Sequence, residues 1–155
     1  MSNSKKYLHT NKIIGNWQSK RLILDRLDGS KALYSGKMNI SPDIEKKVAS
    51  KQGFKHQFIS LHLMEAGTLT TKNETYQFSQ QYTLNLYDDR CDVFFNNKSL
   101  FFGINRFSET QRIDHLCKLD RYFGKITFVN DSSFFLNVNV LGPKKNYYLK
   151  VLYKR

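Results

Sequence analysis

The chain has 155 residues, of which 40% are hydrophobic, and this size suits one domain built around a single core. We therefore treat residues 1–155 as one domain, with residues 1–11 as a flexible N-terminal segment. Lysine and arginine (25) outnumber aspartate and glutamate (13), and the net charge of +12 favours anionic partners such as nucleic acid, acidic lipid or a phosphorylated ligand. The basic residues are spread along the chain rather than gathered in one run, which favours a solvated surface over a dedicated binding stripe.

The cysteine content and the apolar segments of the sequence indicate the cellular compartment of the protein. A small secreted domain held by disulfides would normally carry more cysteines than Cys91 and Cys117, so a reducing compartment is favoured. The N-terminus has no apolar signal region, and no eighteen apolar residues run together. These features predict a cytoplasmic protein with no transmembrane segment. Neither a P-loop nor a dinucleotide-binding glycine motif occurs, so a nucleotide-binding fold is not indicated.

The first half of the chain reads as strands separated by turns. Residues 13–26 are rich in β-branched and aromatic types and lead to the turn signal Asp28-Gly29-Ser30. Residues 32–40 predict the returning strand, in which Gly36 suggests a bulge or a bend. The polar segment near residues 42–55 predicts an inserted loop or one short helix.

Alternation of apolar and polar residues resumes at His56 and predicts a strand that ends before Gly67. The remaining expected strands are 68–72, 74–87, 91–95, 99–107, 122–129, 133–141 and 147–153, with a polar loop between Asn105 and His115. About nine or ten strands with almost no helix predict an all-β, antiparallel up-and-down barrel, because closure removes exposed sheet edges. Such a barrel can hold one small ligand, unless aromatic side chains fill it.

Arg21 and Glu65 are candidate polar residues of the barrel interior. Arg21 follows Trp17 by four residues, so both point to the same face of a regular strand. An inward arginine needs a carboxylate or an anionic ligand, and Glu65 is in phase with its apolar neighbours. Tyr82 is a third candidate for this network. Two interpretations stay open, a structural ion pair and a ligand-binding group.

The segment His115-Leu116-Cys117-Lys118-Leu119-Asp120-Arg121-Tyr122 gathers imidazole, thiol, carboxylate and phenol groups. His115 and Cys117 are at odd-numbered positions, and Asp120 and Tyr122 are at even-numbered positions. Because side chains alternate between the two faces of a strand, a single regular strand cannot direct all four at one pocket. A bulge near Lys118-Leu119 would bring them together. A zinc site is disfavoured because His-x-Cys lacks a second pair of ligands at a familiar spacing. A hydrogen-bonded histidine and a small buried cysteine are the structural alternative.

Gly142-Pro143-Lys144-Lys145 is a turn sequence that carries two lysines. Lys144 is therefore a candidate for a basic rim at the barrel mouth, where it would attract a phosphate or carboxylate. A turn with solvated lysines explains the same residues.

Gly15-Asn16-Trp17 and the terminal Arg155 resemble the Gly-x-Trp motif and terminal basic residue of calycins, the lipocalin-like barrels. Over nearly its full length, the chain resembles the domain-of-unknown-function family 6314. The matching elements are Gly15-x-Trp17-x-x-x-Arg21, Gly36, Glu65-x-Gly67-x-Leu69, Tyr82, Val93-x-Phe95, Phe101, His115-x-Cys117-x-x-Asp120-x-Tyr122 and Gly142-Pro143-Lys144 with Tyr147. The chain departs from the family at Leu84, at Asn97-Lys98-Ser99 and in the insertion near 42–55. The resemblance implies a calycin-like barrel and no established activity.

Three classes of function remain open. We favour a barrel that binds a small anionic or amphipathic molecule without a cofactor or metal. Its candidate ligand-binding residues are Arg21, Glu65, Tyr82, His115, Cys117, Asp120, Tyr122 and Lys144. The first alternative is a cofactor-independent enzyme, isomerase- or lyase-like, in which His115 or Glu65 transfers a proton and Arg21 with Tyr82 stabilises negative charge. The second is a basic module for nucleic-acid binding or complex assembly.

Overall fold

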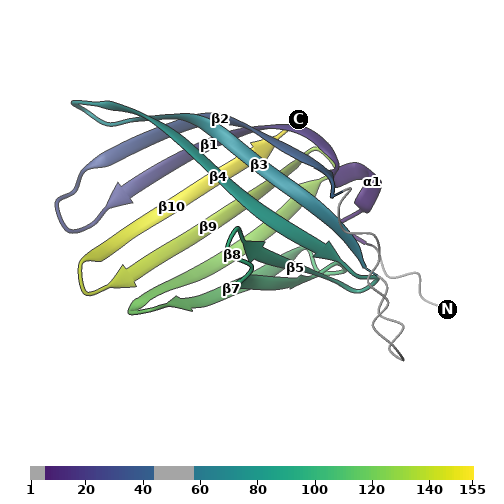
Figure 1. Cartoon of the computed structure of the whole chain (residues 1–155). Coiled ribbons are helices and arrows are strands. Elements are labelled where there is room, and N and C mark those ends of the chain that lie inside the picture. The colour runs from purple at the N-terminus through teal and green to yellow at the C-terminus, as the bar shows by residue number, and fades with distance from the viewer. Residues whose placement is uncertain (1–5, 44–57) are drawn as a thin grey trace.

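The computed structural model describes residues 6–43 and 58–155. In this part of the chain, ten antiparallel strands form one sheet that curls into a nearly closed up-and-down barrel (Figure 1). The elements are α1 (Thr10–Ile13), β1 (Gly15–Asp25), β2 (Lys31–Pro42), β3 (Ile59–Thr70), β4 (Thr75–Leu86), β5 (Arg90–Phe95), β6 (Leu100–Asn105), β7 (Thr110–Cys117), β8 (Asp120–Asn130), β9 (Ser133–Gly142) and β10 (Lys145–Lys154). The predicted all-β barrel is confirmed. The insertion predicted near 42–55 falls largely on residues 44–57, outside the described residues.

Consecutive strands pair with each other except β6 and β7, and β1 also pairs with β10, so that β6 and β7 are the two ends of the sheet. No backbone ladder joins β6 to β7 in the described residues. Side chains bridge them instead: the Asn105 N–H donates to Gln111 Oε1 at 2.5 Å, and the Gln111 amide donates to the Asn105 carbonyl. Further along, the rings of Phe101 and His115 are 5.2 Å apart. We call this β6–β7 junction the seam.

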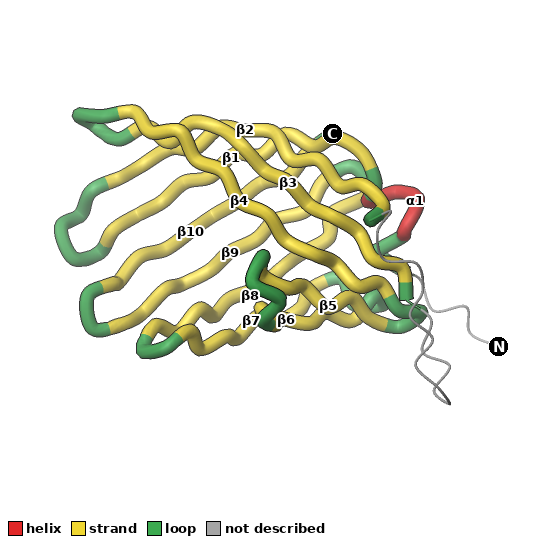
Figure 2. The backbone as a smooth tube through the Cα atoms, viewed as in Figure 1, coloured by secondary structure: helices red, strands yellow, loops and turns green. Residues whose placement is uncertain are grey.

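The β5–β6 hairpin is short and covers only part of β4. Each of its strands has six residues, whereas β4 has twelve. The β4–β5 ladder runs from Tyr82 to Leu86, so in the described structure the first half of β4 has no partner on that side. The turn between β5 and β6 ends midway along the barrel (Figure 2).

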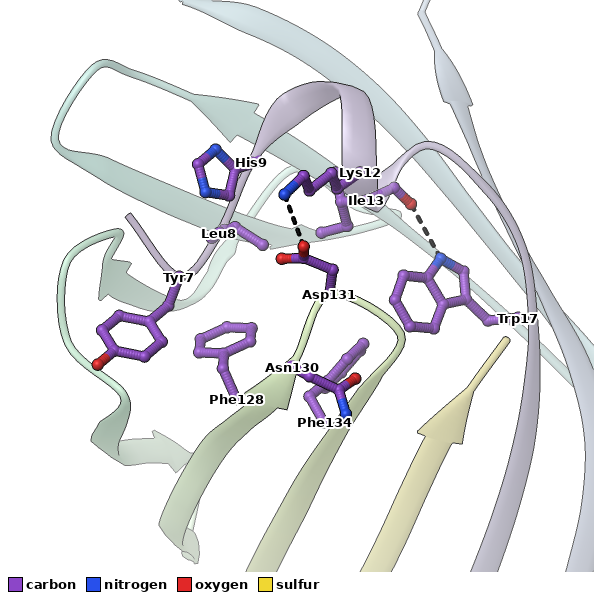
Figure 3. A pocket seen from close by; sticks show the side chains of 10 residues that line it. All are labelled: Tyr7, Leu8, His9, Lys12, Ile13, Trp17, Phe128, Asn130, Asp131 and Phe134. Carbon is purple, nitrogen blue, oxygen red and sulfur yellow. Dashed lines mark hydrogen bonds and ion pairs between the residues drawn. The ribbon is translucent and has the colours of Figure 1, made fainter. Parts of the chain in front are cut away.

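One end of the barrel is closed by α1 and the residues before it (Figure 3). Leu8 is buried, and the guanidinium of Arg106 donates to its carbonyl at 2.9 Å. Lys12 pairs with Asp131 on the β8–β9 turn at 2.6 Å. Leu8, which makes the first of these contacts, belongs to the segment that we expected to be flexible. A cavity of about 20 Å³ remains beneath α1, room for about one water molecule.

The Gly-x-Trp motif and the terminal arginine meet at this closed end. The guanidinium carbon of Arg155 lies 4.7 Å from the centroid of the Trp17 ring, and Arg155 Nη1 donates to the carbonyl of Ile14 at 2.9 Å. A second Arg155 nitrogen donates to the carbonyl of Lys12. Trp17 Nε1 donates to the carbonyl of Ile13 at 2.9 Å. Trp17 and Arg155 therefore fix the helix across the end of the barrel, an arrangement consistent with a calycin-like fold.

Three local predictions were wrong. The polar segment between Asn105 and His115 was expected to be a loop, but it contains most of β7, an edge strand whose outer face is polar because it is solvated. Strand β3 does not end before Gly67 but continues to Thr70. No bulge occurs at Gly36, because both of its ladders keep their register there.

Candidate functional site

The barrel encloses a cavity of about 530 Å³. It extends from Leu8 and Ile13 at the α1 end to Tyr147 and Cys117 near the opposite turns. Cys117 is also exposed, so the cavity reaches the surface beside the β7–β8 turn. Most of the lining is aliphatic or aromatic, which suits the body of an apolar or amphipathic molecule. The aromatic side chains therefore line the interior without filling it.

Arg21, Glu65 and two neighbours form one hydrogen-bonded network in the cavity wall. Glu65 is 2% exposed, and its carboxylate accepts from Arg21 Nη2 at 2.5 Å, Ser19 Oγ at 2.5 Å and Gln80 Nε2 at 2.7 Å. The hydroxyl of Tyr82 donates to Gln80 Oε1 at 3.0 Å. The ion pair expected from the sequence is therefore present, and Tyr82 joins it through Gln80. Sequence reasoning missed Ser19 and Gln80, although both occupy inward positions of the alternation.

The guanidinium of Arg21 is also held by two aromatic rings. Its carbon lies 4.9 Å from the Tyr34 centroid and 5.4 Å from the Phe78 centroid, distances typical of cation–π contacts. Tyr34 lies flat against the sheet because Gly36 and Gly67 leave room: a Cβ on Gly36 would be 2.2 Å from the Tyr34 hydroxyl. Gly36 thus makes room for the Tyr34 ring. Sequence reasoning missed Tyr34, whose signal was its position two residues before that glycine.

Two polar atoms of this region are buried without a hydrogen bond in the described structure: Arg21 Nε and the hydroxyl of Tyr34. Buried donors normally have partners, so such atoms in a cavity wall call for an explanation. Burial disfavours the charge of Arg21, but its interactions with Tyr153, Glu65 and Tyr34 outweigh this effect and raise the pKa of Arg21. The network therefore holds a charged guanidinium whose hydrogen-bonding capacity is not exhausted.

Phenol groups dominate the polar part of the interior. Burial raises the pKa of Tyr147 to about 12, with proximity of Tyr122 as the second cause. Burial likewise raises the pKa of Tyr82 and Tyr153. These phenols are neutral at physiological pH and carry O–H donors. Apart from the Arg21–Glu65 network, the polar groups of the interior are therefore mainly neutral hydroxyls, which can donate or accept hydrogen bonds.

The four reactive groups of the 115–122 segment lie on one face, but not through a bulge. Lys118 and Leu119 form a two-residue turn, with Lys118 at a φ of 56°, and β7 pairs with β8 across it. His115 lies opposite Tyr122 and Cys117 opposite Asp120, and directly opposed residues share a face. The bulge prediction was wrong because the segment was read as one strand rather than as a hairpin.

The four side chains differ in whether they line the cavity and in the residues that they contact. Cys117 and Tyr122 line the cavity. His115 lies at the seam, with ring centroids of Phe101 and Phe95 at 5.2 and 5.5 Å. Asp120 pairs with Lys145 at 2.8 Å, which raises the pKa of Lys145 through this hydrogen bond.

Both turn lysines are exposed, but it is Lys145, rather than the predicted Lys144, that pairs with Asp120 at the barrel end. No ion pair is formed by Lys144 among the described residues. Lys145 was missed because the direction of the first side chain after a turn depends on the length of that turn. Composition alone does not determine this length.

The described residues contain no group of three histidine, cysteine or acidic side chains arranged to hold a metal ion. Cys91 is buried beneath the β5–β6 hairpin, and burial raises the pKa of its thiol to about 12, which keeps it protonated. In the same part of the chain, no helix is long and apolar enough to cross a membrane.

This barrel interior is built with residues from three motifs of the sequence. They are Gly15-x-Trp17, the Arg21–Glu65 pair with Gly36 and Gly67, and the 115–122 hairpin. The profile of the Family of unknown function (DUF6314) matches residues 13–155. The chain belongs to the DUF6314 family. A comparison with curated proteins gives no significant match.

Solved structures share the fold of this DUF6314 protein. It is similar to the S-type phycobiliprotein lyase CPES from Guillardia theta, with a TM-score of 0.58 and 13% identity over 92% of this chain and 86% of that chain. It is also similar to the redesigned β-barrel mFAP1 bound to DFHBI, with a TM-score of 0.46 and 13% identity over 94% and 96% of the two chains. At these identities the likeness concerns the fold alone.

Proposed function

We propose that this DUF6314 protein binds a small amphipathic molecule inside the barrel, with an anionic or carbonyl group of the ligand directed at Arg21. The observation that carries the proposal is a cavity of about 530 Å³ whose mainly apolar wall holds the charged guanidinium of Arg21. Ligand pockets of this volume are typically apolar with a few placed polar groups. The phenols that line the cavity can donate to or accept from the polar groups of such a ligand.

Binding accounts for the site better than proton transfer. A general base needs a carboxylate or imidazole free to reach a substrate proton. The Glu65 carboxylate already accepts from three donors within 2.7 Å. His115 is surrounded by aromatic rings and does not line the cavity. The Arg21–Glu65 pair therefore serves to hold Arg21 in place for a ligand.

Native mass spectrometry of the protein purified from its own source tests the proposal directly, because a retained molecule would appear as an added mass. The anionic dye 1-anilinonaphthalene-8-sulfonate provides a second test by fluorescence titration. Leu149 lines the cavity, whereas Leu152 lies on the outer face of the same strand. We expect Leu149→Trp to weaken dye binding by narrowing the cavity and Leu152→Trp to leave it unchanged. Equal dye binding by both variants would refute interior binding.

The role of Arg21 is tested by the paired replacement Arg21→Met with Glu65→Leu, which removes both charges and leaves no buried charge alone. We expect the folded double variant to lose its preference for the anionic dye over the neutral parent compound N-phenyl-1-naphthylamine. An unchanged preference would show that Arg21 does not recognise the anionic group.

A further inference from the structure

Three adjacent turns at the end of the barrel opposite α1 present apolar side chains to solvent. Leu27 on the β1–β2 turn is 65% exposed, and Leu119 on the β7–β8 turn is 75% exposed. The β9–β10 turn lies between them, because β10 pairs with β1 and β9 with β8, and it carries the exposed Pro143. Figure 2 shows these three turns along the same end of the barrel. We call this set the turn tips.

Each of the turn tips carries a cation next to its apolar residue: Arg26, Lys118 and Lys144. Lys118 and Lys144 form no ion pair within the described residues. The hydrogen bonds from Ser30 lower the pKa of Asp28, so this carboxylate stays ionised and offsets the charge of Arg26. Asp120 pairs with Lys145 at 2.8 Å, which leaves Lys118 and Lys144 as the uncompensated cations of the turn tips. The turn tips therefore present free positive charge together with exposed leucine.

The outer wall of the barrel extends this positive charge. The strand registers place eight exposed cations on the outer faces of β1, β2, β7, β8 and β10: Lys20, Lys31, Lys37, Arg112, Arg121, Lys125, Lys150 and Lys154. The only acid on those faces is Asp114, which pairs with Arg121 at 2.6 Å. By contrast, the outward positions of β3 and β4 carry no lysine, arginine or acid. This asymmetry steers one side of the barrel toward an extended anionic surface.

We propose that the turn tips dock onto a membrane surface that carries anionic lipids. Leu27 and Leu119 would enter the headgroup region, and Lys118 and Lys144 would contact lipid phosphates. A lipid surface provides both an apolar phase for the leucines and negative charge for the lysines. Nucleic acid provides the charge, but its backbone offers no comparable phase for leucine side chains. Cys117, where the cavity reaches the surface, lies two residues from Leu119, so docking would bring the cavity mouth to the membrane.

The proposal goes beyond ligand binding and does not depend on it, because vesicle binding is measured without any cavity ligand. The test is flotation of the full chain with vesicles of phosphatidylcholine alone, or of phosphatidylcholine containing about one third phosphatidylserine. We expect binding to the anionic vesicles only. Leu27→Ser with Leu119→Ser should lower the partition coefficient about tenfold or more, since the two apolar contacts are lost.

Matched variants separate the turn tips from general surface charge. Lys118→Asn with Lys144→Gln removes two cations at the turn tips, and asparagine tolerates the φ of position 118. Lys37→Gln with Lys154→Gln removes two exposed cations from the outer wall instead. We expect the first pair to weaken vesicle binding severalfold more than the second. Val129→Ser, at the α1 end and 51% exposed, serves as the apolar control and should leave binding unchanged.

Three results would overturn the proposal: no binding of the wild-type chain to anionic vesicles at low salt, equal losses in both lysine pairs, or unchanged binding after replacement of both leucines. A salt-dependent affinity for duplex DNA that exceeds vesicle binding would instead identify nucleic acid as the partner and also overturn it. Weakened dye binding in the Leu149→Trp variant with intact vesicle binding would show that the two functions fail separately.

Discussion

Replacing Glu65 with glutamine tests the central network of the cavity wall. The change keeps the shape of the side chain but leaves the Arg21 guanidinium, whose side chain is only 12% exposed, without a countercharge. It also replaces a carboxylate that accepts from three donors by an amide with one acceptor oxygen. Removal of one partner of a buried pair costs about 3–5 kcal/mol of unfolding free energy. We expect about 3 kcal/mol, because water in the cavity can solvate part of the exposed charge.

The assay is urea unfolding followed by circular dichroism and by the fluorescence of Trp17, the single tryptophan. A loss of this size lowers the urea midpoint by about 1–2 M. Asp114→Asn is the matched control, because its ion pair with Arg121 is solvent-exposed and should contribute nothing measurable. A Glu65→Gln variant that loses less than about 1 kcal/mol would refute the reasoning that Arg21 depends on a buried countercharge.

Three further predictions concern other parts of the barrel. Gly36→Ala should cost about 1–3 kcal/mol in the same urea assay, because its Cβ would collide with Tyr34, and an unaffected midpoint would contradict that packing. Arg155→Ala should cost about 1–2 kcal/mol and shift the tryptophan emission to longer wavelength, whereas exposed Lys154→Ala should do neither. Burial raises the pKa of Tyr34 and Tyr147 to about 12, so the unfolded chain ionises first and stability falls as the pH rises from 10 toward 12. A urea midpoint that stays constant across this range would contradict the burial of these phenols.

The sequence predicted the barrel because its strands alternate strongly and its turns carry clear signals. It also predicted the Arg21–Glu65 pair, because two opposite charges at inward positions of the barrel must compensate each other. The side-chain directions expected from alternation along a strand were therefore correct wherever the limits of the strand were predicted correctly. The pattern could not predict Tyr34, since its function depends on two glycines on different strands that only the register brings together.

The errors have a common physical origin in short or solvated elements. β7 is an edge strand, and its outward Thr110, Arg112 and Asp114 gave it the polar look of a loop. The Lys118-Leu119 turn contains neither glycine nor asparagine, the usual residues of a two-residue hairpin turn, so the chain reversal had no sequence signal. A hairpin read as one strand then gave a false conflict between the side-chain directions of Cys117 and Asp120.

The seam gives the barrel a property that a fully hydrogen-bonded cylinder lacks. Widening the junction of β6 and β7 breaks side-chain contacts such as Asn105–Gln111, but no backbone ladder of the described residues. The circumference can therefore expand locally at small energetic cost, and amide hydrogens at the seam should exchange faster than those of β1 and β10. An interior of adjustable width would accept ligands of differing bulk, with the stiff β1–β2–β10 wall holding Arg21 in a constant position.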